Sequence, residues 1–114
     1  MVAQTPAEQA LARSYTTGDA DMRFDIDDLS VEHRPGGAAV LAYRLTVERP
    51  GREGERWAVT LPWEDSSFAD VLASPAPDAE RLRQLVHLVH ALLEEWWDTK
   101  GHNRQSAKMG HRLP

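Results

Sequence analysis

The sequence predicts a small α+β domain in the order α-β-β-β-α. We expect a three-stranded antiparallel meander with a long C-terminal helix packed on one face. Two observations predict this fold. Apolar and polar residues alternate through residues 22–33, 41–48 and 56–63, and apolar residues with helical spacing run through residues 78–100. A strand pattern followed by a single long helix is typical of α+β proteins.

The chain begins with a capped helix. Thr5 can cap it, Pro6 suits the first helical position, and Glu8 completes a capping box. We expect this helix to run from about Pro6 to Ser14. It has few apolar residues, so we expect it to be stable only when docked on the rest of the domain.

The first strand changes phase within its length. Apolar residues occupy even positions from Met22 to Ile26 and odd positions from Leu29 onward. A slip of one residue moves every following side chain to the opposite face of a sheet. We therefore expect a β-bulge or a bend at Asp27–Asp28.

The second and third strands are predicted to pair as an antiparallel hairpin. Their apolar positions match when Val47 faces Trp57, and Arg49 then faces Glu55 across the loop. Proline- and glycine-rich turns separate the three strands. The hairpin therefore has one apolar face for the core and one polar face.

A long helix from about Asp78 to Lys100 closes the domain. At roughly 100° per residue its apolar side chains form one stripe, with Leu88 and Trp97 on the two shoulders. The stripe consists of Leu82, Leu85, Val86, Val89, Leu92, Leu93 and Trp96. We expect this stripe to cover the apolar face of the sheet.

Composition narrows the functional classes. The net charge is −5, which argues against non-specific binding to nucleic acid or to an anionic membrane. There is no cysteine, so disulfides, thiolate nucleophiles and cysteine zinc sites are excluded. The first residues resemble no signal peptide and no apolar run is long enough to span a membrane, so we expect a cytoplasmic protein.

A row of possible metal ligands lies on the long helix. His87, His90 and Glu94 project within roughly 60° of one another, and such side chains one turn apart can chelate a first-row metal. A further ligand would have to come from His33 or from a histidine of the tail. A solvated helix face explains the same residues more simply, and we predict no cofactor.

Acidic residues crowd the first strand. Five of them, Asp19, Asp21, Asp25, Asp27 and Asp28, lie within about ten positions, without the glycine and distal glutamate of a calcium-binding loop. Paired carboxylates can also act in acid–base catalysis. Our interpretation is that these carboxylates lie on the solvent-exposed face of an edge strand, where their charge prevents unwanted pairing with another strand.

The C-terminal tail has the opposite charge to the body. Residues 1–100, which we expect to form a single α+β domain, contain ten basic and eighteen acidic residues, a charge of −8. Residues 101–114 contain three basic and no acidic residues, a charge of +3. We expect the tail to be flexible or ordered by docking, on its own body or on a partner.

Three functions remain open. The first is a non-enzymatic protein–protein interaction or assembly module, acting on a protein partner or as a homodimer. Trp97, on the shoulder of the helix, marks its binding edge if it is only half covered, since tryptophan is enriched at binding hot spots. The alternative is that the N-terminal helix or the tail covers it. The partner-binding candidates are Trp97, His90, Arg104, Lys108 and Arg112.

The second function is binding of a metal or small ligand in the cleft between sheet and helix, with possible enzymatic activity. The third is a nucleic-acid accessory role through the tail, whose three charges make few phosphate contacts. The sequence has no glycine-rich phosphate loop and no nucleophile elbow, which favours a protein that is not an enzyme.

Overall fold

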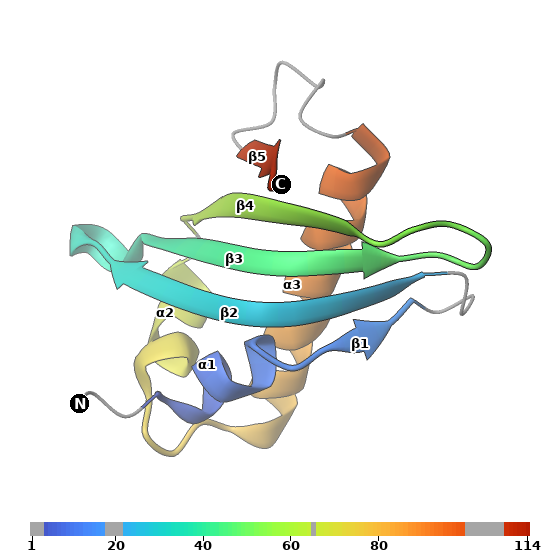
Figure 1. The fold of residues 1–114 in the computed structure, drawn as a ribbon. Coiled ribbons are helices and arrows are strands. Elements are labelled where there is room, and N and C mark those ends of the chain that lie inside the picture. Colours follow the sequence, from blue (N-terminus) through green and yellow to red (C-terminus); the bar gives the residue numbers. More distant parts are fainter. Residues whose placement is uncertain (1–3, 18–21, 65, 100–108) are drawn as a thin grey trace.

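The computed structural model describes residues 4–17, 22–64, 66–99 and 109–114. It is an α+β protein with one antiparallel sheet of five strands in the order β1-β2-β3-β4-β5 (Figure 1). The elements are α1 (Pro6–Leu11), β1 (Tyr15–Thr16), β2 (Arg23–His33), the 3-10 turn η1 (Pro35–Gly37), β3 (Ala39–Glu48), β4 (Glu55–Trp63), α2 (Ser66–Ala73), α3 (Ala79–Thr99) and β5 (Met109–Arg112).

The three helices lie on one side of the sheet, and α3 runs across the strands behind it in Figure 1. The predicted meander corresponds to β2, β3 and β4, and the predicted long helix corresponds to α3. No helix among the described residues has the length and apolar character needed to cross a bilayer.

The sheet has two more strands than the three that we predicted. β1 pairs with β2 through two residues, and β5 pairs with β4 from Met109 to Arg112. Two residues are too few for an alternating pattern, and Gly110 and His111 are not typical strand formers. Both edge strands therefore form because they pair with a neighbouring strand in the tertiary structure, and not because of a local sequence pattern.

The predicted β-bulge is confirmed, because the register of β2 on β3 shifts between Ile26 and Asp28. The predicted hairpin register is wrong by two residues: Val47 lies opposite Glu55 instead of Trp57. A shift of two residues preserves the face of every side chain, so the predicted apolar face of the hairpin still packs in the core. Arg49 and Glu55 do form an ion pair, at 2.7 Å.

The core lies between α3 and the inner face of the sheet. Leu85, Val89, Leu93 and Trp96 of α3 are almost completely buried. They cover the inward side chains of β3 and β4, which include Leu41, Tyr43, Leu45, Val59 and Leu61. Burial of each large apolar side chain stabilises the fold by about 1.5–3 kcal/mol, so this contact dominates the stability.

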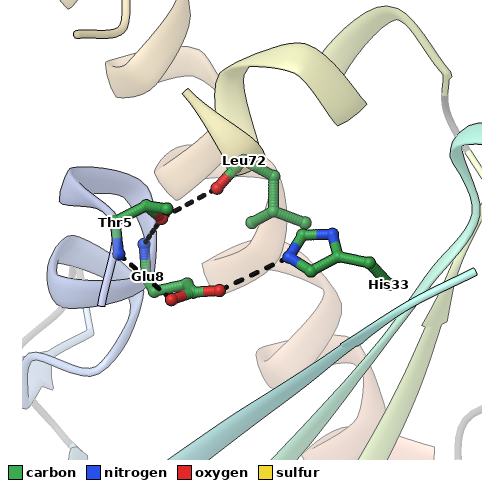
Figure 2. A network of polar contacts seen from close by, with 4 residues as sticks. All are labelled: Thr5, Glu8, His33 and Leu72. Carbon is green, nitrogen blue, oxygen red and sulfur yellow. Dashed lines mark hydrogen bonds and ion pairs between the residues drawn. The ribbon is translucent and has the colours of Figure 1, made fainter. Parts of the chain in front are cut away.

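A polar network holds α1 against the rest of the domain (Figure 2). The capping box is formed as predicted, with the Thr5 hydroxyl accepting from the Glu8 amide at 3.2 Å. The same hydroxyl donates to the Leu72 carbonyl at the end of α2, at 2.8 Å. Glu8 also lies 3.4 Å from Nε2 of His33, so one cap joins α1 to both α2 and β2.

The end of α3 packs directly on β5. Trp96 is fully buried and meets Trp57 of β4 edge to face, with ring centroids 5.3 Å apart. A Cβ added to Gly110 would lie 2.4 Å from Nε1 of Trp96, which is closer than such atoms approach. Only glycine therefore lets β5 lie flat over the indole.

Replacing Thr5 by alanine removes both hydrogen bonds of its hydroxyl. We expect the free energy of unfolding to fall by about 1–2 kcal/mol, as for other lost N-caps. Urea denaturation followed by circular dichroism measures the change. Thr5→Ser keeps the hydroxyl and should lose less than half as much; equal losses in the two variants would contradict the role of this network.

Replacing Gly110 by alanine forces a methyl group into the Trp96 indole. We expect a loss of about 1–3 kcal/mol, as for other overpacked sites. Faster amide exchange in β4, measured by hydrogen–deuterium exchange, should show that β5 has separated. His111→Ala, on the exposed face of the same strand, is the control and should leave β4 protected; similar exchange in the two variants would argue against this contact.

Candidate functional site

The structure separates the predicted metal ligands by environment. His87 is exposed on α3, whereas His90 and Glu94 are partly buried. Among the described residues, no three or more His, Asp or Glu side chains are arranged to hold a metal ion. The helical spacing of His87, His90 and Glu94 therefore does not produce a three-ligand site in the part of the chain that the structure describes.

His90 instead forms a ring stack with Tyr15, the first residue of β1. The two ring centroids are 3.6 Å apart and the ring planes differ by 7°. Tyr15 also stacks on Phe24 of β2, with centroids 5.3 Å apart. The Tyr15 hydroxyl donates to the His90 backbone carbonyl at 3.4 Å, a long and weak hydrogen bond. This stack fastens the β1 edge of the sheet to α3.

Burial keeps both stacked rings uncharged. Desolvation, with a smaller contribution from the nearby His87, lowers the pKa of His90 to about 4. Desolvation, with a smaller contribution from the charge of Glu94, raises the pKa of Tyr15 above its ordinary range. Neither ring changes charge near neutral pH, where general acid–base catalysis requires it. The pair is suited to binding and packing.

Two adjoining hollows lie on the outer side of α3, one on each side of Arg83 and His87. The first hollow, of about 500 Å³, is lined by Phe68, Arg83, Gln84, His87 and Leu88. The second, of about 470 Å³, is lined by Ala10, Arg13, Ser14, Tyr15, Arg83, Val86, His87 and His90. Arg83 and His87 belong to both, so the two hollows form one surface, which we call the α3 groove.

The two ends of the α3 groove differ in chemistry. Leu88 is the one large apolar side chain that is exposed among the described residues, with 40% of its surface accessible, and it shares its hollow with Phe68. The other end contains Arg13, while Arg83 lies between the two ends. Among the described residues that line the two hollows none is acidic, although the chain as a whole has a net charge of −5.

The prediction that Trp97 is half covered is wrong. Its side chain is 5% exposed, because Trp57 packs perpendicular to it with ring centroids 6.5 Å apart and the Arg49 guanidinium lies 5.0 Å above its ring. Cation–π contact of this kind stabilises a packed ring. In this fold Trp97 belongs to the hydrophobic core.

The basic tail is only partly described. Arg104 and Lys108 lie outside the described residues. Arg112 belongs to β5 and lies 3.7 Å from Glu55, which also pairs with Arg49. This end of the tail therefore lies on the body of its own chain, where the acidic charge of the body provides a partner.

Strand β2, which contains the acidic residues, is an edge of the sheet over only part of its length. Ser14 donates to Asp25 at 2.7 Å and accepts from the Ile26 amide at 2.9 Å, just before β1 pairs with the start of β2. From Asp27 onward β2 has one strand neighbour, β3. The edge-strand interpretation therefore applies to the second part of β2, while its start is covered.

Sequence reasoning missed most of the groove. Arg83 and His87 are four residues apart on one helix face, so their proximity could have been predicted. Arg13 lies between α1 and β1, Tyr15 begins β1 and Phe68 comes from α2, and no local pattern places them beside α3. No protein family model, curated protein or solved structure matches the chain, so these contacts stand on the geometry alone.

Replacing His90 by phenylalanine tests the environment of the ring. Nε2 of His90 is buried and has no hydrogen-bond partner among the described residues, so the variant should keep the stack. Its free energy of unfolding at pH 7 should equal that of the wild type or exceed it by up to about 1 kcal/mol. The pKa of His90 falls from 6.5 in the unfolded chain to about 4 in the folded one. As the pH falls, the unfolded chain therefore binds a proton at His90 at a higher pH than the folded chain does.

The contribution of His90 to stability is thus present above pH 6.5 and is lost as the pH falls from 6.5 towards 4. We expect the wild type to lose more stability than His90→Phe over this interval, as measured by urea denaturation at a series of pH values. Parallel pH dependence of the two proteins would show that His90 is solvated like an ordinary histidine.

Proposed function

We propose that this chain is a small non-enzymatic protein-interaction module that binds an acidic and apolar segment of a partner protein in the α3 groove. One observation carries the proposal. Exposed Leu88 and the cationic side chains of Arg13 and Arg83 line one continuous surface, and no acidic residue is among its described lining residues. The absence of cysteine and the acidic composition are consistent with a cytoplasmic module, and we include that location in the proposal.

The shape of the groove favours a polypeptide over a small molecule. Small-molecule sites bury most of their ligand in a concavity with converging polar groups. Here the two hollows lie on the two sides of the ridge that Arg83 and His87 form on α3, with Leu88 in one hollow and Arg13 in the other. A segment of several residues can place an apolar side chain beside Leu88 and a carboxylate beside Arg13 at the same time.

Charge supports an acidic segment. Arg13 has no ion-pair partner among the described residues and is exposed, so a carboxylate can reach it. Arg83 pairs with Glu80, three residues earlier on α3, and its side chain stays largely exposed. An exposed pair of this kind contributes little stability, so a partner carboxylate can share or replace Glu80 at small cost.

A random peptide library displayed on phage, selected against the full-length protein, tests this proposal. We expect enrichment of peptides in which Asp or Glu lies near Leu or another large apolar residue. Fluorescence anisotropy of an enriched peptide should then show binding that weakens at least about tenfold in Arg83→Glu and in Leu88→Asp. Added salt should weaken binding to the wild type as well.

Arg52→Glu is the matched control, because it makes the same change of charge in the exposed turn between β3 and β4, away from the groove. It should leave the affinity unchanged. Failure to enrich acidic–apolar peptides, or enriched peptides that bind Arg83→Glu and Leu88→Asp as tightly as the wild type, would overturn the proposal.

A further inference from the structure

The face of the sheet that points away from the helices is uncovered in the described part of the chain (Figure 1). We call it the open face; its side chains alternate with the core residues along β2, β3 and β4. The centre of this face has small side chains. Ser30, Ala42 and Thr60 are cross-strand neighbours there, and they line a shallow hollow of about 390 Å³ together with Ala58 and other residues.

Small side chains at the centre allow a second sheet to approach closely. Stacked sheets lie about 10 Å apart when their facing side chains interdigitate, and long charged side chains would hold them further apart. On the open face Ala42 is exposed, and Ala58 and Thr60 are partly exposed. A solvated sheet face normally carries longer polar side chains at such central positions.

The open face has an ordered distribution of charge across its strands. One row of cross-strand neighbours reads Asp28 on β2, Arg44 on β3, Ala58 on β4 and His111 on β5. The acidic residue is therefore at the β2 end of the row and the basic residues follow it.

The neighbouring row has the same polarity, from Asp25 on β2 through Thr46 on β3 to Arg56 on β4. Asp27, in the bulge between the two rows, lies 3.4 Å from the Thr46 hydroxyl and adds a further negative charge at the β2 side. In these two rows the open face is thus acidic at β2 and basic towards β4 and β5, whereas the row at the end of the strands has the opposite polarity, with Arg23 on β2 beside Glu48 on β3.

We propose that the open face binds the open face of a second copy of this chain, about a two-fold axis that runs parallel to the strands between β3 and β4. This rotation places β2 over β5 and β3 over β4 of the second copy. Asp28 then lies over His111 of the partner subunit, and Arg44 lies over Ala58 of the partner subunit, where a small side chain leaves room for it.

The direction of the axis follows from the charges. A two-fold axis perpendicular to the strands, in the plane of the interface, would place β2 over β2 and bring acidic residues together, which is unfavourable. An axis parallel to the strands brings the acidic side of each copy onto the basic side of the other. The contact is isologous, as expected of a homodimer, because each copy contributes the same surface.

The size of the open face is sufficient for a dimer. β3 has ten residues. Ten residues span about 33 Å and four strands side by side span about 19 Å, so each copy offers roughly 600 Å². The two copies together bury roughly 1,200 Å², the lower end of the range for specific interfaces. We therefore infer a dimer that dissociates on dilution.

This inference goes beyond the proposed binding of a partner segment, because it uses the opposite side of the sheet. The helices lie on the far face, so the α3 groove of each copy remains accessible in the dimer. A dimer with two grooves can bind two segments of one partner, which raises the apparent affinity without any new contact.

Sedimentation equilibrium of the full-length protein over a range of concentrations tests the proposal. We expect a monomer–dimer equilibrium in the wild type. Asp28→Arg and His111→Asp should each weaken self-association at least about tenfold, because each places like charges opposite one another. A mixture of the two variants should regain a dimer, since Arg at position 28 then faces Asp at position 111.

Ala42→Arg is a second disruptive variant, because it fills the centre of the interface from an exposed position and leaves the core untouched. If circular dichroism shows that Asp28→Arg does not fold, Ala42→Arg provides the test of the interface instead. Leu88→Asp, in the α3 groove, should dimerise like the wild type, and Ala42→Arg should bind the acidic–apolar peptide like the wild type. The two proposals can therefore fail separately.

A wild type that remains monomeric at every concentration would overturn the proposal. A dimer that is unaffected by Ala42→Arg would also overturn it, since the contact would then lie elsewhere. Loss of association in both charge variants without recovery in their mixture would contradict the proposed axis, and with it this arrangement of the dimer.

Discussion

The packing of Trp96 on β4 and β5 is the contact on which the other features of the structure depend. Its indole is fully buried, edge to face with Trp57, and its Nε1 edge occupies the space that a side chain at residue 110 would need. A buried tryptophan removes a large apolar surface from water. The packing of Trp96 fixes α3 across the strands and provides the surface against which β5 packs.

The orientation of α3 then determines both surfaces that we propose to be functional. With Leu85, Val89 and Trp96 turned to the sheet, helical spacing places His87 and Leu88 on the outer side. The same packing adds β5 to the sheet, which brings His111 onto the open face. One buried contact thus leaves a groove on the helical side and a polarised surface on the sheet side.

The local patterns predicted much of this fold. The capping box, the phase slip at the β-bulge and the stripe of α3 each depend on neighbouring residues, and each is found in the structure. The two edge strands, the hairpin register and the burial of Trp97 depend on contacts between distant segments, which no local pattern contains. The groove was missed for the same reason, because Tyr15 and Phe68 reach α3 only through the tertiary fold.

The most direct test of this account is a nuclear Overhauser spectrum of the isotopically labelled full-length protein. If Trp96 supports β5, its indole N–H proton should show strong cross-peaks to the α protons of Gly110, with inter-strand cross-peaks between Gly110 and Val59. Random-coil chemical shifts for residues 109–112, with no cross-peak to Trp96, would contradict the account, because α3 would then end without the strand that completes the sheet.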